Sequence, residues 1–424
     1  MVVWKFVARP NGSGSPACRQ AAGMLCAICG QRTVGQSSGK FRNKNMKHYI
    51  TIIILTMAFG LFGCIGNKKK DEPIKSYADF WNWFQNNKKA FFDVVKNQKD
   101  IEKGFFDKLS PKLSELKEGY FFLAGMLDDN TAELILTADG NIKNIVFVEE
   151  LVEQAPKIKG WKFTALKPAL DAENVAISMY GYRFDSENLF FYSNDNIDYP
   201  DEIDISIIHN DLTKENKNEI TTGIYIFLDN YLGELDFVNN IDNLNIIDRK
   251  EVKKELVPIA KLKEFLTWRQ KEFIEKYDGV RYNTENDEHS VLEAELKSGN
   301  KLIAVINAQL LNWDSRASHP WVAVFTIKYG RSEINGMPNE KNYESLNEIE
   351  TDMLQFLMDK DGYLYIGRQT ADGEREIYFA CKDFRKPSKV FFEMQQKYGN
   401  KFEMEYDIYK DKYWKSFRQF NLNK

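Results

Sequence analysis

"PWVAVFTIKY" (residues 320–329) is the stretch that organises the second half of the chain. After the proline, almost every residue is apolar, and a short apolar run bounded in this way predicts a buried strand. Apolar side chains then recur at helical spacing, at Leu346, Ile349, Met353 and Leu357. This stripe predicts a helix that packs on the strand and turns an acidic face to solvent.

The residues that follow predict two further strands and a second helix. Residues 371–373, Ala-Asp-Gly, separate two apolar segments and are typical of a hairpin turn. We expect Ser388 to cap the next helix, and residues 402–409 to form the last strand. From Trp321 onward the predicted order is β-α-β-β-α-β, the ferredoxin-like arrangement.

The first half of the folded part also mixes helices and strands. Ser76 is predicted to begin a helix, with Asp79 as its capping-box partner. A second amphipathic helix follows and is expected to be interrupted near Pro111. Residues 128–130 separate two alternating segments and predict a hairpin. The predicted fold class is α+β: an N-terminal helical pair, then two mixed α/β-sheet domains, of which the C-terminal one is ferredoxin-like.

The second half resembles an uncharacterised bacterial family, the domain of unknown function numbered 695. The likeness rests on four segments in family order: "HPWVAVFTIKY" (319–329), "GMPNEKNYESLNEIE" (336–350), "YIGRQTADGEREIYFACKD" (365–383) and "KDKYWKSF" (410–417). The sequence departs from the family pattern at Ala380, where an aromatic residue is common. The resemblance implies an α+β module, and it implies no activity and no catalytic residues.

An apolar run lies well inside the chain, in "ITIIILTMAFGLFGCIGNKKKDEP" (residues 50–73). It is short for a membrane-spanning helix, which needs about 20 apolar residues, and suits the core of a signal peptide. Its end, Leu61-Phe62-Gly63-Cys64, resembles the lipobox of bacterial lipoproteins. Phe62 is bulkier than the residue usual at its place. We expect the Cys64 thiol to carry lipid, and an uncleaved N-terminal anchor is the alternative.

These features divide the chain into five segments. Residues 1–45 are expected to be a spurious upstream extension, and residues 46–63 a lipoprotein signal peptide. Residues 64–75 are the expected tether, whose "KKKDE" (68–72) resembles a surface-export signal of some bacterial lipoproteins, with a solvated linker as the alternative. The two expected α+β domains are residues 76–255 and 256–424.

The charge of the chain argues against a nucleic-acid binder. The formal charge is −4, and without the eight lysines and arginines of residues 1–63 the rest of the chain carries −12. Binding to nucleic acid requires a basic face. After Cys64 the only other cysteine is Cys381, so an acylated Cys64 would leave no intrachain disulfide.

Four residues are the candidates for ligand binding: His319, Trp321, Arg368 and Arg375. His319 could act as a base, although a buried structural histidine is the alternative. The two arginines flank the predicted hairpin and could clamp a carboxylate or phosphate, or pair with nearby acids. We expect no catalytic residues, no metal ion and no cofactor, because the chain has no His-Glu-x-x-His, P-loop or Gly-x-Ser-x-Gly motif.

Two charged segments leave alternatives open. "NDNIDYPDE" (194–202) could bind calcium weakly or be a solvated turn. The tail "YKDKYWKSFRQF" (409–420) could touch anionic lipid or RNA, or pack as a structural terminus.

The sequence therefore favours a lipoprotein of the bacterial envelope that binds or scaffolds without catalysis. We expect lipid anchoring in the cell membrane or outer membrane, with surface exposure as one option. The expected partners are the bilayer, through Cys64, and an envelope protein, and no nucleic acid is expected. The alternatives are an envelope hydrolase whose site is assembled from scattered residues and a cytoplasmic RNA-linked regulator.

Overall fold

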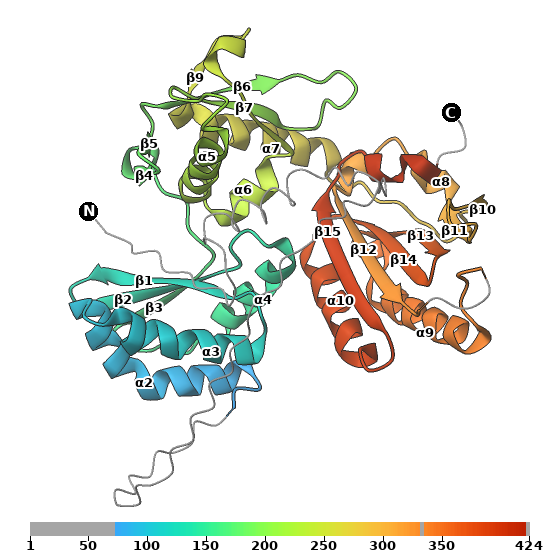
Figure 1. Ribbon diagram of the computed structural model, residues 1–424, viewed down its shortest axis with the longest axis horizontal. Helices are drawn as coiled ribbons and strands as arrows, with labels where there is room; N and C mark the ends of the chain where they lie inside the picture. Colours follow the sequence, from blue (N-terminus) through green and yellow to red (C-terminus); the bar gives the residue numbers. More distant parts are fainter. Residues whose placement is uncertain (1–72, 331–334, 421–424) are drawn as a thin grey trace, which may run out of the picture.

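The computed structural model describes residues 73–330 and 335–420, which form three units with separate sheets (Figure 1). We call them the N-terminal unit (74–166), the middle unit (167–277) and the C-terminal unit (278–420). Their mixture of helices and sheets confirms the predicted α+β class. The predicted extension and signal peptide, with Cys64 and most of the tether, lie outside the described residues.

The N-terminal unit packs helices against a three-stranded sheet of order β1-β2-β3. Its elements are α2 (Tyr77–Asn97), a π-helical stretch (Glu102–Phe106), α3 (Asp107–Leu116), β1 (Phe121–Asp128), β2 (Thr131–Thr137), α4 (Ile142–Glu153) and β3 (Trp161–Ala165). Strands β1 and β2 form the predicted hairpin, whereas β3 runs parallel to β2. The parallel pairing requires the crossover that α4 supplies.

The predicted start of the first helix is correct, and the predicted interruption of the second is misplaced. Ser76 Oγ accepts a hydrogen bond from the backbone N–H of Asp79, which completes the N-cap of α2. Pro111 lies inside α3, and the irregular π-helical stretch ends before α3 begins. A proline removes the hydrogen bond to the carbonyl four residues earlier, here that of Asp107. The distortion is therefore on the N-terminal side of Pro111, next to the carbonyl that loses its donor.

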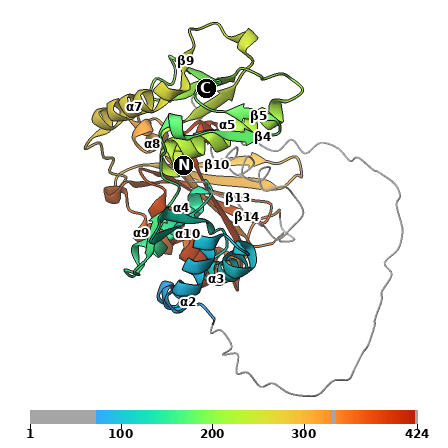
Figure 2. The ribbon, with the colours of Figure 1, turned by 90° about the vertical axis from the view of Figure 1, so that its left-hand side faces the viewer.

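The middle unit holds a four-stranded sheet of order β8-β7-β6-β9 and a short hairpin of β4 and β5. Its elements are β4 (Ile177–Met179), β5 (Tyr182–Phe184), β6 (Leu189–Asn194), β7 (Asp204–His209), α5 (Lys217–Leu232), α6 (Glu234–Asn240), β8 (Asn243–Ile246), β9 (Val257–Pro258) and α7 (Leu262–Tyr277). Helix α5 buries most of its surface, as the apolar sequence of this segment requires. Figure 2 shows α7 and β9 at the opposite end of the molecule from α2 and α3.

The C-terminal unit is built on a six-stranded sheet of order β10-β11-β13-β14-β12-β15 in which all neighbours are antiparallel. Its elements are β10 (His289–Glu295), β11 (Lys301–Asn307), α8 (Ala308–Leu311), β12 (Trp321–Lys328), α9 (Glu340–Phe356), β13 (Tyr363–Ala371), β14 (Glu374–Cys381), α10 (Arg385–Tyr398) and β15 (Glu403–Lys410). From β12 the order is β-α-β-β-α-β, as predicted. Strands β10 and β11 add two members beside β13.

Two local details of this unit follow from single residues. Gly367 lies at a bulge of β13 with φ of 140°, and a Cβ there would come within 2.2 Å of the Val305 carbonyl oxygen, so the close approach of β11 requires glycine. The predicted cap at Ser388 is wrong. Helix α10 begins at Arg385, where the Asp383 carboxylate accepts the Arg385 N–H at 2.7 Å. Ser388 is inside the helix, and its hydroxyl donates to the Phe384 carbonyl.

Buried apolar side chains form three clusters that do not follow the three units one to one. The largest cluster joins the N-terminal unit to the face of the six-stranded sheet that α9 and α10 cover. A second cluster fills the middle unit, and a third lies on the opposite face of the six-stranded sheet. The N-terminal and C-terminal units therefore share a core although the middle unit separates them in the sequence.

The middle and C-terminal units are joined by a buried ion cluster centred on Asp242. The Nζ atoms of Lys410 and Lys412 lie 2.8 and 2.7 Å from its carboxylate oxygens, and the Ile203 N–H donates to it at 2.7 Å. Burial alone would raise the pKa of Asp242, but the two lysines and this N–H hold it at about 2. Burial lowers the pKa of Lys410 to about 8. Lys410 is the last residue of β15, and Lys412 lies two positions further on, in the tail.

The N-terminal and middle units meet at a second buried cluster, in which one lysine faces three carboxylates. Lys167 Nζ lies 2.8 Å from Asp139 and 2.7 Å from Asp229. Glu234 accepts hydrogen bonds from Thr137, at 2.5 Å, and from the Lys167 backbone N–H, at 3.2 Å. Burial raises the pKa of Asp229 to about 6, and the charges of Glu234 and Asp139 oppose the attraction of Lys167.

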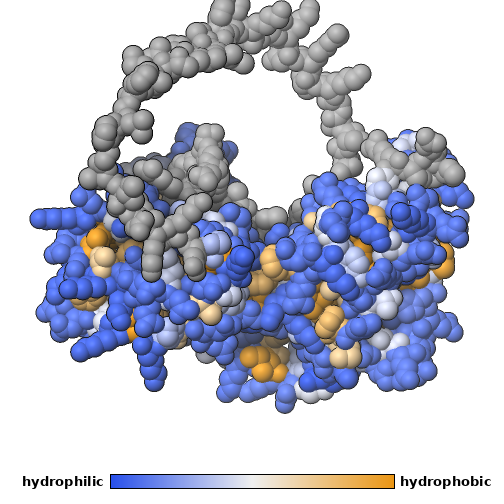
Figure 3. All heavy atoms as spheres, turned by 90° about the horizontal axis from the view of Figure 1, so that it is seen from below, coloured by the Kyte–Doolittle hydropathy of each residue, from blue (hydrophilic) through white to orange (hydrophobic). Residues whose placement is uncertain are grey.

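The face of the molecule seen from below is mainly hydrophilic. Figure 3 shows one face, on which polar residues surround small apolar areas. Within residues 73–330 and 335–420, no helix combines the length and the apolar character needed to cross a bilayer.

We predict that Asp242→Asn destabilises the fold. The change leaves Lys410 and Lys412 buried without a counter-ion, and breaking a buried pair in this way costs about 3–5 kcal/mol of unfolding free energy at pH 7. Because the pKa of Asp242 is lowered to about 2, its contribution to wild-type stability is lost as the pH falls from about 4 through 2. Urea unfolding of both proteins across this pH range measures the difference in unfolding free energy between the wild type and Asp242→Asn. This difference should become smaller as the pH falls. Asp198→Asn, at an exposed position, is the control, and equal stability at pH 7 would contradict the prediction.

We predict the opposite sign for Asp229→Asn. The folded-state pKa of Asp229, about 6, is above its unfolded value, so protonation stabilises the fold and the ionised form at pH 7 is unfavourable. The neutral amide should raise the free energy of unfolding by about 1–3 kcal/mol at pH 7.5, and this gain should vanish near pH 4. Thermal unfolding at both pH values tests this, with exposed Asp236→Asn as the control. Destabilisation at pH 7.5 would show that the ion pair with Lys167 outweighs the repulsion.

Candidate functional site

The two candidate arginines meet on the sheet face that α9 covers. Strands β13 and β14 carry Arg368 and Arg375, and α9 places Glu350 between them. Arg368 Nη1 and the Tyr365 hydroxyl both donate to Glu350 Oε1 at 2.6 Å. Arg375 Nη1 lies 3.6 Å from the other carboxylate oxygen. The sequence placed these arginines near each other correctly, and the acid that pairs with them comes from the helix.

Arg375 has further partners that fix α9 on the sheet. Its Nε donates to Thr370 Oγ1 at 3.2 Å and its Nη1 to Asn347 Oδ1 at 2.9 Å. The ring of Tyr343 lies 5.5 Å from the guanidinium, and the arginine side chain is only 2% exposed. A buried charge is tolerated only when it is paired and hydrogen-bonded. The guanidinium pair thus holds the protein's own carboxylate in the described structure.

His319 is fully buried at the start of β12. Ser318 Oγ lies 2.8 Å from its Nδ1, and Trp414 Nε1 donates to its backbone carbonyl at 2.9 Å. Its Nε2 has no hydrogen-bond partner among the described residues. Burial lowers the pKa of His319 to about 3, and the nearby Lys382 and Arg281 add to the shift. The imidazole is therefore neutral at physiological pH.

Trp321, the fourth candidate, packs in the large shared core. Its ring centroid lies 4.9 Å from that of Phe384, and its side chain is buried. In the β12–β14 register it is opposite Cys381, whereas Arg375 is opposite Ile327. Six residues of strand, about 20 Å, separate these two positions. The structure thus brings Arg368 and Arg375 together and places His319 and Trp321 elsewhere.

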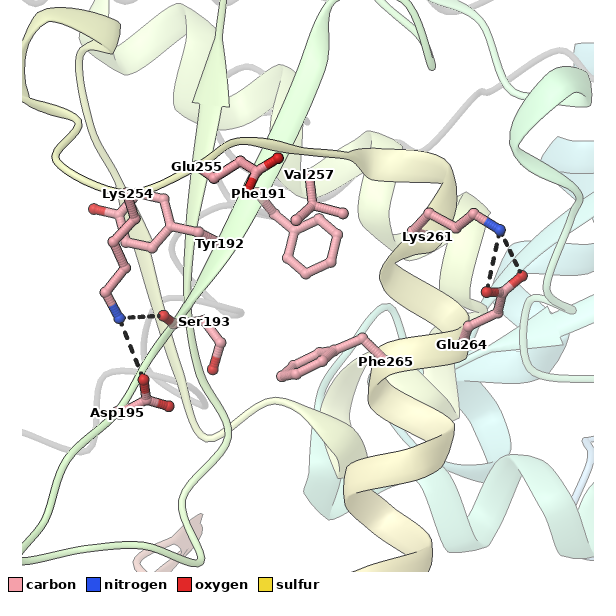
Figure 4. A pocket seen from close by; sticks show the side chains of 10 residues that line it. All are labelled: Phe191, Tyr192, Ser193, Asp195, Lys254, Glu255, Val257, Lys261, Glu264 and Phe265. Atoms are coloured by element: carbon pink, nitrogen blue, oxygen red, sulfur yellow. Dashed lines mark hydrogen bonds and ion pairs between the residues drawn. The ribbon is translucent and has the colours of Figure 1, made fainter.

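An open pocket of about 510 Å³ lies between β6 and α7 of the middle unit (Figure 4). Phe191 of β6, Val257 of β9 and Phe265 of α7 give it an apolar floor. The ring of Phe265 lies 5.8 Å from that of Phe191 and 6.0 Å from that of Trp268, whose side chain is 53% exposed. Binding sites for small ligands and peptide side chains are commonly of this size and apolar character.

The rim of this pocket is charged. Lys254 Nζ donates to the Ser193 carbonyl oxygen at 2.8 Å and lies 3.4 Å from Asp195. Lys261 and Glu264 form an ion pair at 3.2 Å on the opposite side (Figure 4). An apolar floor with a polar rim is the usual composition of a binding surface. A second open hollow, of about 490 Å³, lies around residues 152–163 of the N-terminal unit.

Sequence reasoning missed the β6–α7 pocket. Its residues come from two segments about sixty positions apart, which β9 brings together by pairing with only Phe190 and Phe191. A two-residue strand has no periodicity that could predict it. The signal that was present is the pair Phe265 and Trp268, an apolar pair at helical spacing that extends beyond the buried face of α7.

The two charged segments with open alternatives contact each other. In the loop 194–202, Asp201 accepts hydrogen bonds from Lys276, Tyr277 and Tyr413 at 2.6–2.8 Å. Glu202 pairs with Lys415 of the tail at 2.6 Å. No group of three or more potential metal ligands is present among the described residues. The tail therefore packs against the middle unit, and its Lys415 serves as the counter-ion of Glu202 in the loop.

Comparison with known proteins gives one match, and it lies in the C-terminal part of the chain. An α+β module with one antiparallel sheet and two helices on one face defines this part of the chain. Residues 297–422 match the model of a family of unknown function, DUF695. The resemblance predicted from the sequence is thus confirmed. No curated protein and no solved structure matches the chain significantly.

We predict that Glu350→Gln loosens α9. The neutral amide leaves Arg368 and Arg375 close together without their shared anion, so the free energy of unfolding should fall by about 3 kcal/mol. Chemical denaturation measures the loss, and hydrogen exchange should show faster exchange in α9 than in α10. Glu344→Gln, an exposed position on the same helix, should have little effect. If both variants match the wild type, the cluster does not hold the helix.

Proposed function

We propose that the chain is a membrane-anchored lipoprotein of the bacterial envelope, acylated at Cys64, which acts as a non-enzymatic binding or scaffolding protein. The lipobox-like "LFGC" (61–64) and the acidic charge of the rest of the chain support the anchoring and argue against RNA. Stable anchoring needs two lipid chains or equivalent signals, and a fully acylated cysteine provides them.

The observation that carries the binding role is the β6–α7 pocket. It is open to solvent, its floor is aromatic and aliphatic, and its rim ions are exposed. Exposed rim charges contribute little to affinity but orient a partner, whereas a desolvated aromatic floor supplies most of the binding energy. A pocket of this kind on a tethered body suits capture of a peptide segment or small molecule.

The surroundings of the candidate ligand-binding residues support a non-enzymatic role over the hydrolase alternative. Arg368 and Arg375 share Glu350, and the imidazole of His319 is fully buried behind Trp414. A general base must come within hydrogen-bond reach of its substrate. Groups held in buried pairs stabilise the fold instead. Changing them should therefore lower the stability of the protein rather than remove a catalytic activity.

The anchoring is tested by metabolic labelling with an alkyne analogue of palmitate. We predict incorporation into the wild-type chain and its complete loss in Cys64→Ala, since the acyl chains attach through this residue and its new amino terminus. Cys381→Ala removes another thiol, a buried one, and should keep the label. Label that survives in Cys64→Ala would refute acylation at that residue.

The same preparations separate binding from catalysis. Wild-type protein in detergent should be silent in a broad panel of hydrolase substrates. Turnover that disappears in His319→Gln or Arg375→Gln, with an unchanged circular dichroism spectrum, would favour the hydrolase. Recovery of the wild-type protein in the soluble cell fraction would instead favour the cytoplasmic regulator.

A further inference from the structure

The six-stranded sheet of the C-terminal unit has one edge that another unit covers and one that no strand covers. Beside β15, Lys143 of α4 donates to the Tyr406 carbonyl oxygen at 3.1 Å, so the N-terminal unit closes this side. At the other end β10 pairs only with β11, and no strand in the described part of the chain pairs with its outer side. An edge strand presents a row of unpaired backbone N–H and C=O groups.

Strand β10 is long for an open edge and carries an exposed aliphatic residue. It has seven residues, "HSVLEAE", and Val291 at its centre is 63% exposed. The next residue, Leu292, points to the other face of the sheet, away from α9 and α10. It is only partly buried there, against the third apolar cluster. Soluble proteins usually protect an edge with short length, proline or charge. Here the strand is neither short nor interrupted, and charge is its only protective feature.

The charges of β10 distinguish between the ways in which two copies could pair. In an antiparallel pair centred on Leu292, His289 of each copy faces Glu295 of the other, Ser290 faces Ala294, and Val291 faces Glu293. An imidazole beside a carboxylate forms a favourable cross-strand pair, twice by symmetry. In a parallel in-register pair, Glu293 and Glu295 would each face their own copies, which is unfavourable. The sequence thus favours one closed two-fold arrangement over an open stack.

We propose that the outer edge of β10 is an interface for a second copy of this chain, which pairs antiparallel about Leu292 and joins the two six-stranded sheets into one. The occupant is another copy because His289 faces Glu295 at both ends of the pair, and the small Ser290 and Ala294 leave room for the two leucines. Leu292 meets Leu292 of the second copy at the centre, with small residues beside it on that face. In such an isologous contact the same surface of each copy is used up, so the assembly stops at a dimer.

The oligomeric state of the full chain in detergent tests the interface. Sedimentation velocity should show a monomer–dimer equilibrium, and Glu295→Lys should weaken dimerisation about tenfold by placing a lysine against His289. The double variant His289→Glu with Glu295→Lys places opposite charges against each other and should restore the dimer. Leu127→Lys, on another strand with an exposed leucine, is the matched control. A wild-type chain that is monomeric at every concentration overturns the proposal, and so does a double variant that stays as weak as Glu295→Lys.

The register is tested by single cysteines. Residues at the two-fold centre have their Cβ atoms about 5 Å apart, within the range of a disulfide. Leu292→Cys should therefore give a covalent dimer on non-reducing gels after mild oxidation, above the background of the wild-type chain. Ala294→Cys lies opposite Ser290 in this register and its two copies are about 13 Å apart, so it should not cross-link. Equal cross-linking of the two variants would overturn the pairing about Leu292.

Discussion

The carboxylate of Asp242, with two buried lysines around it, is the interaction on which the arrangement of the units depends. Lys412 is 1% exposed and Lys410 6%, so neither charge could remain there without an anion. The anion comes from the middle unit, some 170 positions earlier in the chain. Lysines near the end of an acidic protein therefore serve as internal counter-ions. Lys415 of the tail pairs in the same way with Glu202 of the polar loop 194–202. The net energy of a buried ion pair is the small difference between a large desolvation cost and a large attraction. Its geometry is nevertheless specific, because the two lysines reach the Asp242 carboxylate in one relative position of the two units.

The shared apolar core has the same consequence for the other two units. The helix-covered face of the six-stranded sheet is closed partly by side chains from residues 74–166, and Arg385 of α10 forms a two-point ion pair with Glu149 of α4 at 2.7 and 2.8 Å. The DUF695 match includes α10 and β15 but neither α4 nor the middle unit. The C-terminal part consequently buries apolar and charged surface against segments outside the matched residues. In this chain the C-terminal part is therefore packed as one unit of a larger folded structure.

Local signals predicted the fold well where a single residue type sets the geometry. The Ser76 cap and the turns at residues 128–130 and 371–373 are correct, because capping and hairpin turns depend on neighbouring residues alone. Ser388 failed because Asp383 offered an earlier acceptor and Pro387 is tolerated in a first turn. The site was less predictable. The hairpin brought Arg368 and Arg375 together, but nothing local indicated that Glu350 of α9 would sit between them. Likewise, the β6–α7 pocket depends on a two-residue strand pairing that leaves no periodic signal.

The proposed anchor and the proposed pairing constrain each other geometrically. Two copies whose sheets continue antiparallel are related by a two-fold axis perpendicular to the sheet. If each copy is fastened to the same leaflet by lipid at Cys64, the two anchors lie at one height when that axis is also perpendicular to the bilayer. The joined sheet would then lie parallel to the membrane. Residues 64–73 can span at most about 35 Å when fully extended, so Ile74 and the shared core beside it would stay within that height of the surface. Anchoring and pairing are thus compatible in this orientation, which places the N-terminal unit close to the lipid.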